Sequence, residues 1–129
     1  MNKIIVEVSI GELLDKISIL EIKKGKIKDT EKLKFINNEH SILKDQLENN
    51  KKNDDNLKKL YQSLKEINSK LWLIEDEKRL CEKEKDFGDK FIKLSRDVHF
   101  LNDDRAKIKL EINNHTGSTI KEIKEYTSY

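Results

Sequence analysis

The stretch "LKKLYQSLKEINSKLWLIEDEKRLC", from Leu57 to Cys81, decides the fold class of this chain. Its apolar residues follow one another at alternating steps of three and four, and they are Leu57, Leu60, Leu64, Ile67, Leu71 and Ile74, with Lys78 and Cys81 continuing the row. This spacing puts the apolar side chains on one stripe of an α-helix, as in the seam of a coiled coil. The sequence therefore predicts a helix over residues 55–85.

A second apolar row of the same kind begins in the segment "DFGDKF", Asp86 to Phe91. Its members are Phe87, Phe91, Leu94, Val98, Leu101, Arg105, Ile108 and Ile112, and they predict a helix over residues 88–114. Gly88 marks the expected bend, and Asn114 or Gly117 is expected to take the left-handed conformation that ends the helix. Two long helices joined by a tight bend pack as an antiparallel hairpin.

The N-terminal third predicts two shorter helices, over residues 10–27 and 30–48, before the polar loop "ENNKKNDDN". "SIGE" matches a capping box, in which Ser9 caps the first helix and Glu12 reaches back to the amide of Ser9. Ile19 and Ile22 widen the apolar arc of this helix, so we expect it to pack on more than one neighbour. Residues 3–8 predict a strand or an extended arm, and residues 118–129 an irregular tail.

The expected architecture is one all-α domain over residues 1–129, in which antiparallel helical hairpins form an elongated bundle of three to four helices. Of the 129 residues, 35% are hydrophobic and 40% are charged, and none is proline. Helical hairpins that each bury one stripe need few apolar residues, and nothing in the sequence breaks long helices.

Charge, cysteine content and hydropathy indicate which kinds of partner the chain can bind and in which cellular compartment it is expected. The 27 basic and 25 acidic residues are mixed along the chain and leave a net charge of +2, so no nucleic-acid-binding patch is predicted. The single Cys81 excludes an internal disulfide and fits a reducing compartment. No apolar run is long enough to span a membrane, and we therefore expect a cytoplasmic protein without membrane insertion.

The sequence carries no familiar catalytic or metal-binding motif. His40, His99 and His115 share no metal-ligand spacing with one another or with Cys81. It also contains no glycine-rich phosphate loop, nucleophile elbow or zinc motif. We therefore predict neither a metal site nor a cofactor.

Each long helix also carries a second row, polar and aromatic, rotated away from its apolar stripe. On residues 55–85 the row comprises Tyr61, Lys65, Asn68, Trp72, Glu75, Arg79 and Glu82, and on residues 88–114 it comprises Ile92, Arg96, His99, Asp103, Ala106 and Leu110. Such rows are either solvated ladders of ion pairs or the walls of a polar groove for an anionic or hydroxylated ligand. Trp72 and Tyr61 favour the groove. A large aromatic side chain among charged residues either lies along the surface with its polar tip in water or stacks on another group, such as a ligand.

Arg105 stands where the apolar row asks for a leucine. An unpaired guanidinium inside the seam is costly, so either a carboxylate meets it or the seam is open at that height. Antiparallel pairing makes Glu66 the nearest candidate partner, followed by the acids of residues 10–27. The alternative is that Arg105 bends outward along its aliphatic stem.

Three segments carry a family resemblance: "VSIGELLDKISILEIKKGKI" at residues 8–27, "LWLIEDEKRLCEKEKDFGDKF" at 71–91, and "NDDRAKIKLEIN" at 102–113, followed by "TGS". Together they resemble a bacterial family of small helical proteins of unknown function, over nearly the whole length. Genes of that family often lie near glycosyltransferase and surface-polysaccharide genes, so the resemblance implies an accessory role in surface-glycan assembly. The chain departs from the family pattern at Ser95 and His99, and its tail runs past the usual ending.

The family motifs select candidate ligand-binding residues that overlap the second row. They are Glu12, Asp15, Lys16, Glu21, Trp72, Glu75, Asp76, Arg79, Glu82, Arg96, Asn102, Asp103 and Arg105. Our leading hypothesis is a non-catalytic helical bundle that binds an anionic or sugar-nucleotide-like ligand, or a protein partner, through a polar and aromatic groove between its helices.

Two other classes of function stay open. The first is a small all-α enzyme acting on a phosphorylated substrate. A Mg²⁺-dependent nucleotide hydrolase would need paired acidic motifs that the chain does not reproduce, and a chorismate-mutase-like enzyme would need an arginine that residues 10–27 lack. The second is a coiled-coil scaffold, as a homodimer, which requires only the two apolar seams.

Overall fold

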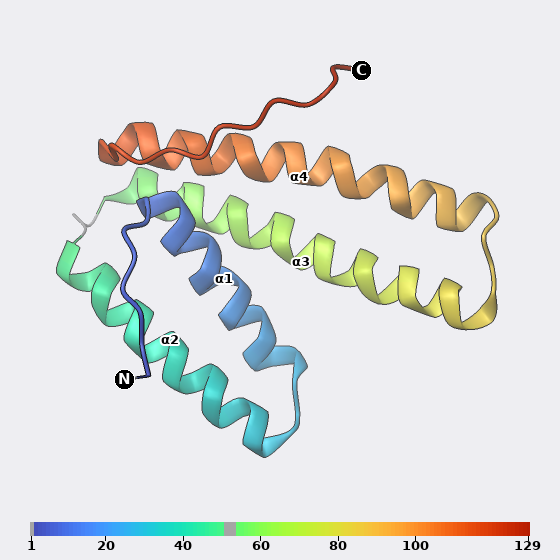
Figure 1. Ribbon diagram of the computed structural model, residues 1–129, viewed down its shortest axis with the longest axis horizontal. Helices are drawn as coiled ribbons and strands as arrows, with labels where there is room; N and C mark the ends of the chain where they lie inside the picture. The colour runs from blue at the N-terminus through green and yellow to red at the C-terminus, as the bar shows by residue number, and fades with distance from the viewer. Residues whose placement is uncertain (1, 51–53) are drawn as a thin grey trace.

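The computed structural model describes residues 2–50 and 54–129, which contain four α-helices and no strand. The helices are α1 (Ile10–Lys26), α2 (Thr30–Asn50), α3 (Asp55–Glu84) and α4 (Asp89–Thr116). Helices α3 and α4 form a long antiparallel hairpin, and the shorter hairpin of α1 and α2 lies across one end of it (Figure 1). The all-α helical bundle predicted from the apolar spacing is confirmed.

Helix α1 is the central element of the bundle. It packs against α2, α3 and α4, as the width of its apolar arc predicts. The core cluster consists of Leu13, Leu14, Ile17, Leu47, Leu57, Leu64 and Ile112, so all four helices contribute to it. Because α1 is shorter than α3 and α4, it covers only the end of their hairpin at which α3 begins and α4 ends (Figure 1).

The start of α1 follows the predicted capping box in one half only. The hydroxyl of Ser9 accepts a hydrogen bond from the amide of Glu12 at 3.1 Å, as predicted. The carboxylate of Glu12 turns instead to Lys109 of α4, whose Nζ lies 2.8 Å away. The predicted hydrogen bond from the amide of Ser9 to Glu12 is therefore wrong. A buried ammonium group is a stronger partner for a carboxylate than a backbone amide.

Helices α1 and α4 approach each other closely at Gly11. The amide of Gly11 donates to Oδ1 of Asn113 at 2.8 Å. A Cβ atom at this glycine would lie 2.7 Å from the backbone oxygen of Lys109 and 2.8 Å from Oδ1 of Asn113. Only a residue without a side chain fits between the two helices here.

The helix ends differ from prediction in detail. Gly117 has a φ of 69° and ends α4 in the predicted left-handed conformation. At the bend between α3 and α4 the left-handed residue is Lys85, with a φ of 59°, whereas Gly88 caps α4 with a φ of −84°. The predicted loop "ENNKKNDDN" is shorter than expected, since α2 continues to Asn50 and α3 begins at Asp55. Its residues 51–53 lie outside the described residues.

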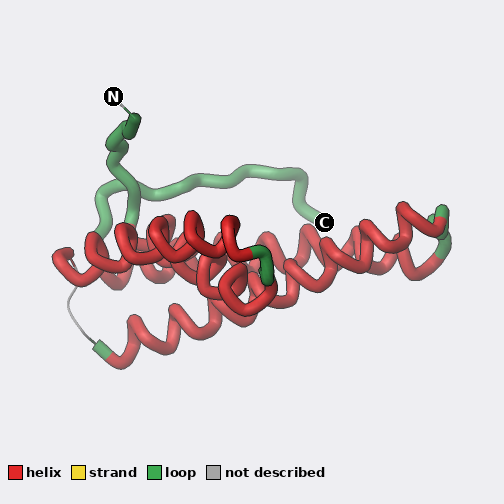
Figure 2. Tube along the Cα trace, turned by 90° about the horizontal axis from the view of Figure 1, so that it is seen from below, coloured by secondary structure: helices red, strands yellow, loops and turns green. Residues whose placement is uncertain are grey.

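The two terminal segments are extended and lie outside the helices. Residues 2–8 form an exposed arm and no strand, so the strand alternative for residues 3–8 is not borne out. The tail after Gly117 has no regular secondary structure and runs back along α4 (Figure 1, Figure 2). No helix within residues 2–50 and 54–129 is both long and apolar enough to cross a membrane.

Candidate functional site

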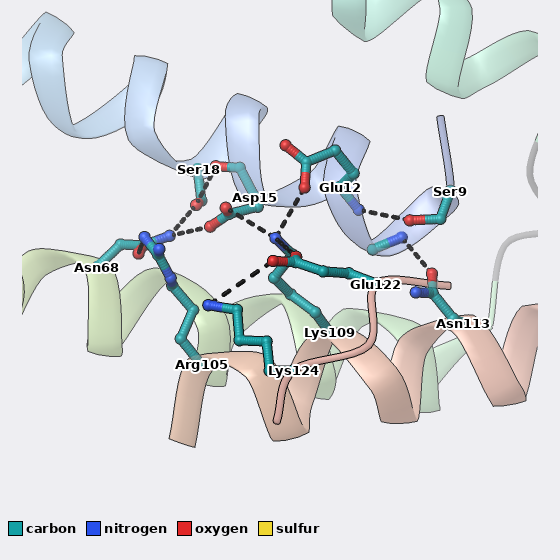
Figure 3. A network of polar contacts seen from close by, with 11 residues as sticks. Ser9, Glu12, Asp15, Ser18, Asn68, Arg105, Lys109, Asn113, Glu122 and Lys124 are labelled. Carbon is teal, nitrogen blue, oxygen red and sulfur yellow. Dashed lines mark hydrogen bonds and ion pairs between the residues drawn. The ribbon is translucent and has the colours of Figure 1, made fainter. Parts of the chain in front are cut away.

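A buried polar network joins α1, α3, α4 and the C-terminal tail beside the core cluster (Figure 3). Its centre is Lys109, 7% exposed, whose Nζ lies 2.8 Å from Glu12 and 3.4 Å from Asp15 of α1. The same ammonium group binds Glu122 of the tail at 3.1 Å. Burial acts to lower the pKa of Lys109, but hydrogen bonds to Glu12 and Glu122 outweigh it and raise the pKa above its ordinary value. Lys109 is therefore a cation at neutral pH, and it ties three segments together.

Asn68 of α3 connects this network to Arg105 (Figure 3). Its side-chain Nδ2 donates to Oδ1 of Asp15 and to Oγ of Ser18, both at 2.8 Å. Its Oδ1 accepts a hydrogen bond from Nη1 of Arg105 at 3.3 Å. Because Asn68 is only 4% exposed and is hydrogen-bonded at both ends of its amide, it holds Arg105 in one orientation.

Arg105 therefore has a neutral partner, and the prediction that Glu66 meets it is wrong. Glu66 is exposed and lies two residues before Asn68. Two residues turn a helix by about 200°, so Glu66 lies on the far side of α3. The acid of α1 near this height, Asp15, is already paired with Lys109. No carboxylate of the described residues lies within 4.0 Å of the guanidinium of Arg105.

A groove of about 320 Å³ opens beside Arg105, between α1 and the α3–α4 hairpin. Its walls are Ile19, Asn68, Leu71, Trp72, Glu75, Asp76, Arg79 and Arg105, and we call it the Trp72 groove. The structure thus brings five predicted candidates together: Trp72, Glu75, Asp76, Arg79 and Arg105. Arg79, like Arg105, has no carboxylate within 4.0 Å among residues 2–50 and 54–129.

A second hollow, of about 340 Å³, lies between α4 and the C-terminal tail. Its walls are Val98, His99, Asn102, Asp103, Arg105, Lys124, Tyr126 and Tyr129, and we call it the tail pocket. Three predicted candidates, Asn102, Asp103 and Arg105, lie here. The hydroxyl of Tyr129 donates to the carboxylate of Asp103, and its ring packs edge-on against His99 with 5.2 Å between centroids. Arg105 belongs to both hollows.

Glu21 lies apart from both hollows, in a cluster between α1, α2 and α3. Its carboxylate accepts a hydrogen bond from the hydroxyl of Tyr61, and it lies 3.4 Å from His40 and 3.5 Å from Lys65. Burial acts to raise the pKa of Glu21, but the bond from Tyr61 and the charge of Lys65 outweigh it, and the pKa lies below its ordinary value. This ionised group fastens the shorter hairpin to α3.

The remaining candidates divide between the network and the surface. Glu12 and Asp15 pair with Lys109, whereas Lys16, Glu82 and Arg96 are exposed and line neither the Trp72 groove nor the tail pocket. Arg96 lies over the ring of Phe100, 6.0 Å from its centroid. Within the described residues, the polar rows of α3 and α4 form no ion pairs of their own, and no group of three or more His, Cys, Asp or Glu could hold a metal ion.

Sequence reasoning missed Lys109 and the tail residues of the second hollow, Lys124, Tyr126 and Tyr129. A signal for Lys109 existed: Arg105, Lys109 and Asn113 follow one another at steps of four, which is a polar row next to the apolar one. No comparable signal marked the tail, because an irregular segment has no period that places its side chains.

Residues 4–129 match a family of unknown function, DUF6165. The chain belongs to DUF6165. The family resemblance drawn from the sequence motifs is confirmed, and the match spans the arm, the helices and the tail of this DUF6165 chain. No curated protein and no solved structure matches it.

Proposed function

We propose that this DUF6165 chain is a non-catalytic cytoplasmic protein that binds a phosphorylated, hydroxylated small molecule, a sugar phosphate, in the Trp72 groove. The observation that supports this proposal is that Arg79 and Arg105 line the same groove and that neither forms an ion pair with a carboxylate of residues 2–50 and 54–129. Two of the three arginines of a lysine-rich chain thus lie where an anionic ligand would fit. Such ligands are met in surface-glycan assembly, the setting that the family resemblance implies.

The groove offers a complementary group for each part of a sugar phosphate. Arginine binds phosphate through two parallel donors, which a lysine does not provide. Trp72 offers a flat apolar face to the sugar ring, and the carboxylates of Glu75 and Asp76 accept hydrogen bonds from hydroxyl groups. Because Asn68 already fixes Arg105, little side-chain freedom is lost on binding.

Changing Arg105 to leucine is expected to weaken the binding of glucose 1-phosphate by about tenfold or more, which corresponds to the loss of one hydrogen bond to a charged group. We expect the free energy of unfolding to change by no more than about 1–2 kcal/mol, because the protein loses a single hydrogen bond to Asn68 and gains apolar contact. Calorimetric titration and urea unfolding measure the two quantities. Arg96→Leu, exposed on the same helix and outside the groove, is the matched control.

Four results would count against this function. Failure of glucose 1-phosphate to bind, or equal binding by Arg105→Leu and the parent chain, contradicts a ligand site in the Trp72 groove. A loss of stability above about 3 kcal/mol in Arg105→Leu would assign the arginine a structural role. Release of inorganic phosphate from the ligand in the presence of Mg²⁺ would favour the enzyme alternative.

The outer half of the α3–α4 hairpin favours a second candidate function, a homodimeric scaffold. Beyond α1 the hairpin projects as two helices without a third (Figure 1). Its exposed large apolar side chains are Leu73 (52%), Leu80 (45%), Phe87 (50%), Ile92 (53%) and Phe100 (40%). Two helices bury only the seam between them, and two of these residues, Leu73 and Phe100, line one hollow that a further helical surface would cover.

We propose that a second copy of the chain packs on the hollow lined by Lys70, Leu73, Ile74, Glu77, Asp97, Phe100 and Leu101. This face carries one base and two acids, so a two-fold axis can bring Lys70 of each copy to an acid of the other. Light scattering is expected to give twice the 15.3 kDa chain mass for the parent and the chain mass for Leu73→Glu. Leu110→Glu, on α4 outside the hollow, should remain dimeric. A monomeric parent chain at micromolar concentration contradicts the dimer.

A further inference from the structure

Arg105 stands between two hollows that each hold further cations. On one side it shares the Trp72 groove with Arg79, and on the other it shares the tail pocket with Lys124. The guanidinium has hydrogen-bonding capacity to spare, because Asn68 is its only partner within the described residues. An anionic group at this point would meet Arg79 on one side and, on the other, Lys124, whose Nζ also lies 3.7 Å from Glu122.

The tail forms a fixed wall of the tail pocket, because several contacts hold it in place. Oγ of Ser118 accepts a hydrogen bond from the amide of Ile10 at 3.2 Å. Glu122 binds Lys109 at 3.1 Å (Figure 3). The hydrogen bond from Lys109 also holds the pKa of Glu122 below its ordinary value, so this anchor stays ionised at neutral pH. Further along, Tyr129 reaches Asp103.

The two hollows differ in what they can recognise. The Trp72 groove combines one aromatic face with two carboxylates, which suits a ring that carries hydroxyl groups. The tail pocket combines the rings of Tyr126, Tyr129 and His99 with the side-chain amide of Asn102. Aromatic faces beside an amide suit a flat heterocyclic base, which stacks on the rings and exchanges hydrogen bonds with the amide at its edge.

We propose that the Trp72 groove and the tail pocket are two halves of one site for a nucleoside diphosphate sugar. The diphosphate lies at Arg105, between Arg79 and Lys124, the sugar lies against Trp72, and the base stacks on the tyrosines of the tail. The volumes of about 320 and 340 Å³ together fall within the range of small-molecule sites. This inference rests on the proposed function and deepens it, because it names the ligand class and gives the tail a part in recognition.

Three probes test the two halves separately: glucose 1-phosphate for the sugar half, UMP for the base half and UDP-glucose for the whole, with the corresponding compounds of the other common bases. The parent chain is expected to bind the whole ligand at least about tenfold more tightly than either part, because joining two parts spares the entropy of a second association. Calorimetric titration gives the three dissociation constants.

Variants of the two halves act as controls for each other. The double variant Tyr126→Ala, Tyr129→Ala should weaken the binding of UMP and of UDP-glucose by about tenfold and leave the binding of glucose 1-phosphate unchanged. Trp72→Ala should weaken the binding of glucose 1-phosphate and of UDP-glucose and leave the binding of UMP unchanged. Both tyrosines are 75% exposed, so the double variant is expected to fold. Circular dichroism checks the helices of both variants.

The outcomes separate the two proposals. If glucose 1-phosphate binds and depends on Trp72, but the whole ligand binds no more tightly or the tail variant weakens all probes alike, the two-half site is overturned and the Trp72 groove stands. If glucose 1-phosphate does not bind, the proposed function and this inference both fall.

Discussion

Replacing Lys109 with methionine is expected to lower the free energy of unfolding by about 3–5 kcal/mol. Methionine keeps much of the apolar stem and removes the ammonium group, which lies within 4.0 Å of Glu12, Asp15 and Glu122. Asp15 is buried and would remain as a charge without its cation. Urea unfolding, followed by the fluorescence of the single tryptophan or by circular dichroism, measures the change.

Two further variants separate the ion pairs from a general effect of removing a lysine. Lys107→Met, exposed two positions earlier on α4, should change stability by less than about 0.5 kcal/mol. Asp15→Asn in the Lys109→Met background should recover part of the loss, since a neutral amide needs no cation. Equal stability of Lys109→Met and the parent chain would mean that the buried network contributes nothing.

The effect also has a pH dependence of known sign. The pKa of Glu122 is lowered in the folded state, chiefly by its hydrogen bond from Lys109, so its contribution is present above the ordinary glutamate pKa of 4.5 and is lost as the pH falls through the folded value. The pKa of Lys109 is raised, so its contribution is present below 10.5 and is lost only as the pH rises further. The stability difference between the parent and Lys109→Met should therefore be constant near neutral pH and shrink in acid.

The helices could be predicted from the sequence because each one repeats a single physical signal. Apolar residues at steps of three and four predict α3 and α4 and their pairing in a hairpin, and the wide apolar arc of α1 predicts that it packs on more than one neighbour. What a helical period does not give is the rotation of one helix against the next. Glu66 was expected opposite Arg105 for that reason, whereas Asn68, two residues further along α3, faces it in the structure.

The candidate site was predictable where its residues lie on one helix. Trp72, Glu75, Asp76 and Arg79 are neighbours on α3, and helical spacing alone groups them. Lys109 was missed although it lies at steps of four from Arg105 and Asn113, because one lysine in a lysine-rich chain does not stand out from those that face solvent. The tail pocket depends on an irregular segment that lies along α4, and its course is determined by tertiary anchors at Ser118, Glu122 and Tyr129.

Changing Gly11 to alanine is expected to destabilise the protein by about 1–3 kcal/mol or more. The added Cβ would lie 2.7 Å from the backbone oxygen of Lys109, and a backbone atom inside a helix cannot move aside cheaply. Helix α1 would have to shift away from α4, which strains the hydrogen bond between Gly11 and Asn113 and the ion pair between Glu12 and Lys109. Thermal and urea unfolding measure the loss.

The same chemical change at Gly25, in the last turn of α1, is expected to have the opposite sign. A Cβ at Gly25 meets no atom within 4 Å, so alanine adds no clash there. Alanine also restricts the unfolded chain more than glycine does, which should stabilise the protein by about 0.5–1 kcal/mol. If both variants were stabilised, α1 and α4 would not be in contact at Gly11, which would contradict the close approach of the two helices beside Lys109. Opposite signs from one substitution in one helix can come only from what lies across from each glycine.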